Sequence, residues 1–126
     1  MSRMTRLGLI GAGGIAPGHY ERLMATASVE IAGIAEPSTA SLKRFYRRCP
    51  GAEGTPVYPD YKTLLDTCDL DGVLVLSPHA YHFEQIRDAL RKGLHVLSEK
   101  PLVCTSAHAE QLIQLAKKVG RVLSLS

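Results

Sequence analysis

The chain has 126 residues, of which 45% are hydrophobic and 21% charged, and its formal net charge is +3. A chain of this size can bury one hydrophobic core without disulfides or metals, so we interpret residues 1–126 as a single domain. The basic residues are scattered, and their one dense group, Arg44, Arg47 and Arg48, is typical of a solvated helix face. The charge pattern therefore gives no support for a nucleic-acid partner.

Cysteine usage and apolar runs narrow the class of protein further. Cys49, Cys68 and Cys104 form neither a CxxC pair nor an even-numbered framework, which favours reduced thiols in a cytoplasmic protein and no metal site. The apolar run near the N-terminus is short and breaks into glycines, unlike a signal peptide. No stretch approaches the roughly 20 apolar residues of a membrane span, so we expect no membrane partner.

Short apolar runs alternate with amphipathic segments along the whole chain. In the first half, runs that end at turn residues predict strands, and apolar residues three or four positions apart predict helices. Ala16, Tyr20 and Leu23 mark the first helix. The other elements expected here are strands at Arg6–Gly11, Val29–Ala35 and Val57–Tyr58, and helices at Thr39–Arg48 and Tyr61–Asp66.

The second half continues this alternation. Gly72–Leu76 is continuously apolar, as expected for a central parallel strand that is covered on both faces. Phe83, Ile86 and Leu90 then mark a helix. Lys92-Gly93 ends it, because a cation and a following glycine are both typical of a helix C-terminus.

The last three predicted elements are a strand, a helix and a strand. His95–Ser98 is the fifth strand and Val122–Leu125 the sixth. Between them, Thr105 can cap a helix that Gly120 ends. The apolar residues that we expect on the buried face of this helix are Ala109, Leu112, Ile113 and Ala116.

Six strands that alternate with helices predict a parallel sheet with right-handed crossovers. The count matches the doubly wound strand order 3-2-1-4-5-6, which is built from two halves of three strands each. We therefore predict the α/β class: a Rossmann fold with one doubly wound, six-stranded parallel sheet in a single domain.

The segment from Gly11 to Ala16 fits the pattern GxGxxG/A between the first strand and the first helix. Gly11 permits the tight turn, Gly13 lets the backbone approach a pyrophosphate, and Ala16 keeps the helix close to the strand. Gly14 and Ile15 complete the turn, where free N–H groups at the helix N-terminus favour phosphate. These five residues are cofactor-binding candidates; a glycine-rich turn without a ligand is the alternative for the pattern taken alone.

Glu36 follows the second strand, roughly 20 residues beyond the glycines, where a carboxylate can bind both ribose hydroxyls of an adenosine. Taken alone, it is equally typical of a solvated loop acid. The order of these features (a strand, the glycines, a helix, a second strand and the acid) predicts that the chain binds a nicotinamide dinucleotide. A carboxylate repels the 2′-phosphate of NADP, so NAD is the preferred cofactor; NADP stays possible because Lys43 and Arg44 can reach in from the next helix.

Two further segments leave strands four and five, at the edge where an open α/β sheet receives its ligand. They are Ser77-Pro78-His79-Ala80-Tyr81-His82 and Glu99-Lys100-Pro101. With the glycine turn, the pattern SPHAYH…AL…GLHVLSEKPL closely resembles the N-terminal domain of the glucose–fructose oxidoreductase / inositol dehydrogenase / MocA family. The resemblance covers essentially the whole chain, and Glu99-Lys100-Pro101 is its most specific element.

The resemblance implies an NAD(P)-dependent oxidoreductase that acts on a hydroxyl or ketone of a sugar, inositol or similar polyol. It implies that Ser77, Pro78 and His79 line the nicotinamide half of the cofactor, although the family more often has Asn at the position of His79. It also implies that Glu99 and Lys100 reach the nicotinamide ribose.

The resemblance further implies that Lys100 is catalytic and touches the reacting hydroxyl. An ammonium beside that oxygen stabilises developing alkoxide charge and, with a lowered pKa, can relay the proton. Without its Glu-Lys-Pro context, Lys100 would be an ordinary loop lysine. His82 is a further cofactor-binding candidate, with packing at the start of its helix as the alternative.

The family's members continue into a second domain that supplies most substrate contacts. We therefore expect this chain to be the cofactor domain of a longer enzyme, inactive by itself, and to form homo-oligomers through the apolar surface that the second domain would meet. The alternative is a dinucleotide-binding regulatory or sensor protein without catalysis. The lysine at position 100 favours the enzyme.

Overall fold

The computed structural model describes residues 4–26, 28–99 and 105–125. Strands and helices alternate through them, with two short 3-10 helices, η1 and η2, before β3 and α4. The elements are β1 (Thr5–Ile10), α1 (Ala16–Met24), β2 (Val29–Ala35), α2 (Thr39–Arg48), η1 (Pro50–Ala52), β3 (Val57–Tyr58), α3 (Tyr61–Thr67), β4 (Gly72–Val75), η2 (His79–Tyr81), α4 (His82–Arg91), β5 (His95–Ser98), α5 (Ser106–Val119) and β6 (Leu123–Leu125).

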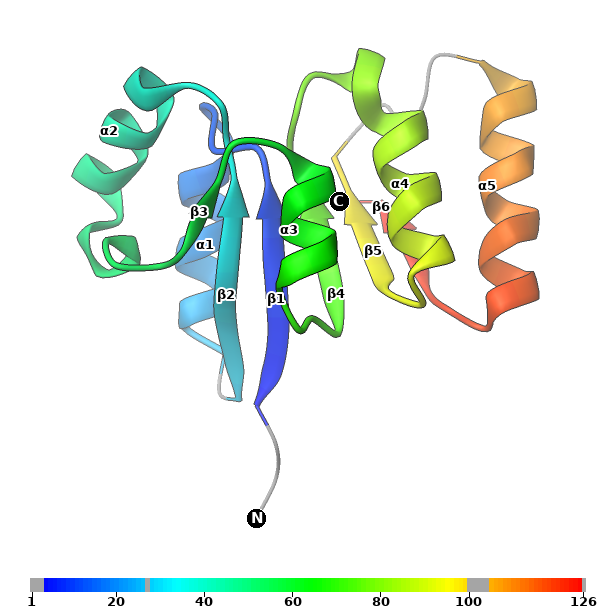
Figure 1. Ribbon diagram of the computed structural model, residues 1–126, viewed down its shortest axis with the longest axis horizontal. Coiled ribbons are helices and arrows are strands. Elements are labelled where there is room, and N and C mark those ends of the chain that lie inside the picture. Colours follow the sequence, from blue (N-terminus) through cyan, green and yellow to red (C-terminus); the bar gives the residue numbers. More distant parts are fainter. Residues whose placement is uncertain (1–3, 27, 100–104, 126) are drawn as a thin grey trace.

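The strands form one sheet in the order β3-β2-β1-β4-β5-β6, and all five neighbouring pairs are parallel. Figure 1 shows the strands pointing the same way, with their carboxyl ends at the top of the view. The predicted Rossmann class, strand count and strand order are therefore confirmed. The predicted elements differ from the observed ones by one residue at several ends, as expected for boundaries set by hydrogen bonding.

Helices cover the sheet on two faces, and each face has its own apolar core. On one face, Ala16 and Tyr20 of α1 and Phe45 of α2 pack over Leu9 and Ile34. The other face is covered by α3, α4 and α5 (Figure 1). Buried side chains of these three helices form a second core with the same sheet. β4 is buried along its whole length, because both layers meet it, and this explains its uninterrupted apolar sequence.

The predicted buried face of the last helix is partly wrong. Leu112 and Ala116 are buried and Ala109 is half-buried, but Ile113 is 40% exposed. α5 packs mainly against α4 at the edge of the sheet, so its buried stripe is narrow. Leu115, one turn on from Leu112, packs against the core instead of Ile113. The predicted Thr105 cap is confirmed, since its hydroxyl accepts a hydrogen bond from His108 N at 3.1 Å.

Candidate functional site

A hollow of about 520 Å³ lies at the carboxyl ends of the central strands. β1 and β4 are neighbours in the sheet at this place. From β1 the chain continues to β2 on one side, and from β4 it continues to β5 on the other side. This is the switch point at which doubly wound sheets bind their ligands. Segments from four different turns line the cleft, and they include Gly11, Gly13, Glu36, Asp60, Ser77 and Tyr81.

The glycine turn contributes two glycines that serve different needs. Gly11 has a φ of +102°, and a Cβ built on it would lie 2.8 Å from the backbone N of Ser77. The fold itself therefore requires glycine at position 11. A Cβ on Gly13 would meet no atom of the described residues within 4 Å, and Gly13 does not have a positive φ. No described neighbour therefore requires glycine at this position, and the vacant space beside it fits the close approach of a ligand.

The remaining residues of the turn lead into α1. Ala16 is fully buried against the sheet, as predicted, and its N–H donates to Gly13 O at 3.0 Å. Gly14 and Ile15 are exposed beside the cleft. Because α1 begins here, its first N–H groups point toward the strand ends, where they favour an anionic ligand.

Glu36 joins the turn to the end of β2. Its Oε1 accepts a hydrogen bond from the N–H of Ala12 at 2.8 Å, and its Oε2 accepts one from the N–H of Ser38 at 3.0 Å. The carboxylate is half-buried and lines the same cleft as Gly13. Each oxygen retains a lone pair for a further donor, so the group can hold the turn and accept from a ligand together.

The segment after β4 divides its residues between the cleft and the core. Ser77 and Pro78 line the cleft on the side opposite Glu36, and the Ser77 hydroxyl donates to Oε1 of Gln85. His79 is exposed in η2 and is not among the lining residues of the cleft. Sequence reasoning did not select Tyr81, which also lines the cleft and is 59% exposed.

His82 is 1% exposed and lies among the ends of two strands. Its Nε2 donates to the carbonyl oxygen of Ser77 at 2.7 Å, and its Nδ1 lies 3.4 Å from the hydroxyl of Ser98. The imidazole thus ties the end of β4 to the end of β5. These contacts fit the alternative given for His82 in the sequence analysis, namely packing at the start of its helix.

Glu99 follows β5 on the far side of the switch point. Its N–H donates to Val75 O at 3.1 Å, and its Oε2 lies 2.7 Å from His19 Nε2 on α1. Lys100, the predicted catalytic residue, lies outside the described residues. Sequence reasoning gave His19 no catalytic role. It lies one helical turn from Ala16 and from Leu23, on the apolar face of its helix. A polar side chain on such a face requires a partner, and that signal was present in the sequence.

The loop between β3 and α3 supplies the remaining wall of the cleft, with Asp60 and Tyr61. The Thr63 N–H that Asp60 caps lowers the pKa of the Asp60 carboxyl. Burial, and then the hydrogen bond to Asp88, raise the pKa of the Tyr61 hydroxyl, which donates to Asp88 Oδ2 at 2.7 Å. Both residues follow a predicted strand at the ligand edge, which is the signal that could have found them.

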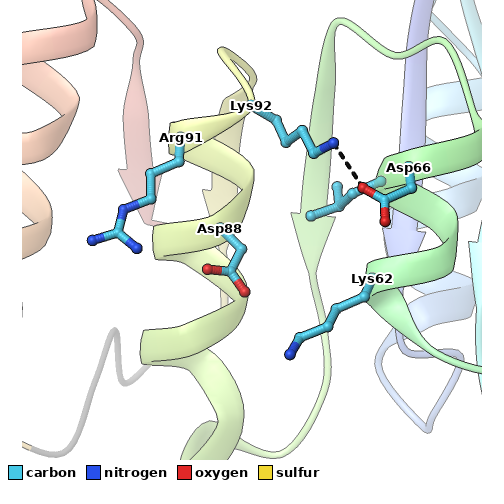
Figure 2. A pocket seen from close by; sticks show the side chains of 6 residues that line it. Lys62, Asp66, Asp88, Arg91 and Lys92 are labelled. Carbon is cyan, nitrogen blue, oxygen red and sulfur yellow. Dashed lines mark ion pairs between the residues drawn. The ribbon is translucent and has the colours of Figure 1, made fainter.

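A second hollow, of about 280 Å³, lies between α3 and α4 near their C-terminal ends. Figure 2 shows its charged lining, in which Lys92 Nζ pairs with Asp66 Oδ1 at 2.7 Å. Asp88 already accepts hydrogen bonds from Tyr61 and Arg87. Helices run back from the carboxyl edge of the sheet, so this hollow is at the opposite end from the glycine turn. Both carboxylates of its lining already have partners, and we assign the hollow no ligand.

Two other kinds of site are absent from the described part of the chain. No helix there is long and apolar enough to cross a membrane. In the same residues, no group of three or more His, Cys, Asp or Glu side chains is placed to hold a metal ion.

Comparison with known proteins identifies relatives along the whole chain. A dTDP-3,4-didehydro-2,6-dideoxy-alpha-D-glucose 3-reductase of Streptomyces antibioticus is 37% identical over 123 residues, which are 97% of this chain and 36% of that protein. An inositol 2-dehydrogenase of Streptomyces avermitilis is 31% identical over 125 residues, 98% of this chain and 36% of that protein. The chain thus spans little more than a third of the length of these relatives.

Solved structures agree with this likeness. A 3-ketoreductase from Actinomadura kijaniata, in complex with TDP-benzene and NADP, superposes with a TM-score of 0.84 at 36% identity, over 98% of this chain and 38% of that one. The WlbA dehydrogenase from Chromobacterium violaceum, in complex with NADH and UDP-GlcNAcA, has a TM-score of 0.88 at 25% identity, over 99% of this chain and 35% of that one.

The model of one protein family matches residues 5–126, and its description is an oxidoreductase family with an NAD-binding Rossmann fold. The match covers nearly the whole chain, and the sheet order, the glycine turn and the cleft are those that such a fold requires. The chain therefore belongs to the Gfo/Idh/MocA oxidoreductase family and is an NAD-binding Rossmann domain of that family.

Proposed function

We propose that the cleft binds the ADP half of NAD, with the pyrophosphate at the glycine turn and the adenosine ribose at Glu36. The observation that carries this proposal is the vacant space at Gly13, a glycine that neither backbone conformation nor packing requires. Gly14, Ile15 and Ala16 complete the phosphate-binding turn. Glu36 lines the same cleft, with acceptor capacity remaining on both oxygens.

We propose that NAD binds more tightly than NADP. A 2′-phosphate placed near Glu36 would meet a carboxylate that the Ala12 and Ser38 amides hold in position, and like charges at close range repel. Relatives that bind either cofactor are known, since the solved 3-ketoreductase holds NADP and the WlbA dehydrogenase holds NADH. The choice therefore rests on residues of this chain.

Calorimetric titration of the chain with NAD and with NADP tests both proposals. We expect saturable binding of NAD and a dissociation constant for NADP at least about tenfold higher, which is about 1.4 kcal/mol. Equal or tighter binding of NADP would refute the assigned preference. Absence of binding by either dinucleotide would refute the cofactor site itself.

We infer that the protein carrying this chain is an oxidoreductase that acts on a CH–OH group of a sugar, inositol or similar polyol. Bound NAD supplies the hydride acceptor for such a reaction. Ser77, Pro78, His79, Glu99 and Lys100 are assigned to the nicotinamide half from the resemblance, and His82 is kept as a further cofactor-binding candidate. Lys100 is the residue proposed to stabilise alkoxide charge and move the hydroxyl proton. The sugar nucleotide reductases and inositol dehydrogenases among the relatives support this substrate class.

The 126-residue chain alone is expected to show no dehydrogenase activity, because catalysis requires a substrate held in near-attack geometry and the relatives devote nearly two thirds of their length to other residues. Assays of NAD reduction with a panel of polyols check this. In a longer protein that turns over a polyol, Lys100→Met should lower turnover by about 100-fold or more while NAD affinity changes little. Turnover within a few-fold of the parent would reduce Lys100 to a ribose ligand.

We also propose that copies of this chain associate. Val122, next to β6, is 61% exposed, and Ile113 on α5 is 40% exposed, and exposed apolar side chains of this kind favour association. Sedimentation velocity over a range of concentrations would detect dimers or larger species. A monomer at every concentration would contradict the proposal.

A further inference from the structure

The His19–Glu99 contact joins two elements that are 80 residues apart in the sequence. His19 is 6% exposed on α1, the helix that begins at the glycine turn. Glu99 follows β5, and its side chain is 27% exposed. The separation of 2.7 Å between Nε2 and Oε2 is at the short end for an N–H donor and a carboxylate. A buried imidazole on the phosphate-binding helix therefore holds a carboxylate at the end of the second half of the sheet.

The neighbour on the other side of the ring identifies the donor. His19 Nδ1 lies 3.4 Å from Nη2 of Arg22, one turn further along α1. A guanidinium has donors and no acceptor, so Nδ1 accepts and the ring proton resides on Nε2. His19 therefore donates to Glu99, and the positive charge of Arg22 lies behind the ring. The row Arg22, His19, Glu99 directs a donor at one oxygen of the carboxylate.

The backbone of Glu99 is fixed as well. Its N–H donates to Val75 O at 3.1 Å, which extends the pairing of β5 with β4 by one residue. The Ser98 hydroxyl lies 3.1 Å from the carbonyl oxygen of Glu99 and 3.4 Å from Nδ1 of His82. Among the described residues, Glu99 Oε1 has no hydrogen-bond partner. One carboxylate oxygen is thus held and the other remains available.

The resemblance to the family assigns Glu99 to the nicotinamide ribose, and the topology agrees with that assignment. In a doubly wound sheet, a dinucleotide crosses the switch point with its pyrophosphate on the first glycine turn and one nucleoside over each half. Glu36 lies on the first half, and Glu99 lies beyond β4 on the second. The second ribose offers vicinal hydroxyl groups, which are the donors that a carboxylate accepts.

We propose that His19 is a positioning residue that holds the Glu99 carboxylate, so that Oε1 accepts a hydrogen bond from the second ribose of the dinucleotide. The inference rests on the proposed cofactor function. It adds that α1 acts at both ends of the ligand: its N-terminus faces the pyrophosphate, and its buried histidine orders the carboxylate for the second nucleoside. A ligand without the second ribose gains nothing from His19.

Two soluble probes separate these effects. ADP contains the adenosine and the two phosphates, and ADP-ribose adds the second ribose. We expect the unaltered chain to bind ADP-ribose more tightly than ADP in calorimetric titrations. His19→Asn should lower ADP-ribose affinity by about tenfold, as for the loss of one charge-assisted hydrogen bond, and should leave ADP affinity within about twofold.

His19→Gln is the matched control. Its amide nitrogen lies near the position of Nε2, whereas the amide of Asn lies near that of Nδ1, so the two variants have the same polarity and differ in reach. His19→Gln should retain most of the ADP-ribose affinity. Glu99→Gln should lower ADP-ribose affinity like His19→Asn, and the double variant should lose less than the sum of the two, because both substitutions remove the same contact.

The outcomes separate failure of the proposed cofactor site from failure of the positioning role of His19. Failure of the unaltered chain to bind ADP would overturn the proposed cofactor site, and this inference with it. ADP binding with no gain for ADP-ribose would overturn this inference alone. Equal ADP-ribose affinities for His19→Asn and the unaltered chain would also overturn this inference. A parallel loss of ADP and ADP-ribose affinity in His19→Asn and Glu99→Gln would overturn it too, because the pair would then have only a structural role.

Discussion

The two halves of the sheet build the ligand edge by different means. In the first half, the turn after β1 presents backbone atoms to the ligand edge. Its decisive features are Gly11, which has a φ of +102°, and Gly13, which lies beside open space. In the second half, β4 and β5 end in segments that side chains hold in place, through His82 on Ser77 and His19 on Glu99. The first kind of site fails when a Cβ is added, whereas the second fails when a donor is removed.

The backbone half should show the largest effect, at Gly11. In Gly11→Ala, the new Cβ would lie 2.8 Å from Ser77 N and 3.0 Å from Leu76 C, in a positive-φ conformation. Strain and overpacking together should lower the free energy of unfolding by about 3 kcal/mol or more. Gly13→Ala, two positions on, should leave it unchanged or slightly raised. Urea denaturation of both variants measures the difference, and equal losses would remove the distinction between the two glycines.

Gly13 tests the ligand side of the same turn. Gly13→Val should remain folded, since a Cβ there meets no protein atom within 4 Å. NAD affinity should fall about 100-fold or more, because the side chain would occupy the space that the pyrophosphate needs. Gly18→Ala is the control within α1: its Cβ makes only an ordinary contact, 3.6 Å from Arg22. Undiminished NAD affinity in folded Gly13→Val would show that the phosphate lies elsewhere.

The side-chain half should respond differently, at His82. In His82→Leu, the Ser77 carbonyl loses a donor at 2.7 Å in a buried site, which should lower stability by about 2 kcal/mol. His82→Gln, which restores an N–H donor, should recover part of the loss. Such rescue has no counterpart at Gly11. Thermal denaturation of both variants measures it, and a Gln variant as unstable as the Leu variant would assign the whole effect to shape.

Glu36 is the side chain on which the backbone half depends. Glu36→Ala removes the acceptor of the Ala12 and Ser38 amides and the proposed ribose ligand. NAD affinity should fall about tenfold, and the preference for NAD over NADP should narrow because the repelling charge is gone. Competition titrations with both cofactors measure this. An unchanged preference would move the discrimination to residues other than Glu36.

The same difference explains which features the sequence revealed. Gly11, Gly13 and Glu36 were found because a turn between a strand and a helix imposes local requirements, and these leave a pattern at fixed spacing. The six strands followed from periodicity in the same way. His19 and Glu99 lie 80 residues apart and Tyr61 and Asp88 lie 27 apart, so no local pattern joins them. Ile113 was wrongly predicted to be buried, because the helical period shows which way an apolar face points but not how wide a stripe of it the neighbouring elements cover.

The smallest expected effect concerns acid stability, at the helix cap beside the cleft. Asp60 Oδ1 accepts from the N–H of Thr63 at 2.7 Å and from its hydroxyl at 2.9 Å, and this backbone N–H is the main reason that the Asp60 pKa is lowered. Because the folded pKa lies below that of the unfolded chain, about 3.9, the unfolded state binds more protons as the pH falls. Stability is therefore full at neutral pH and declines through the acidic range.

Asp60→Asn isolates this contribution, because Asn caps a helix about as well as Asp and does not titrate. Melting temperatures of the variant and the parent should agree at pH 7, and the parent should lose more of its stability between about pH 5 and pH 3. Some acid sensitivity should persist in the variant: although burial raises the pKa of Asp88, the hydrogen bonds from Tyr61 and Arg87 lower it overall. Parallel curves for the two proteins would mean that the carboxylate charge at this cap adds nothing to what an uncharged acceptor provides.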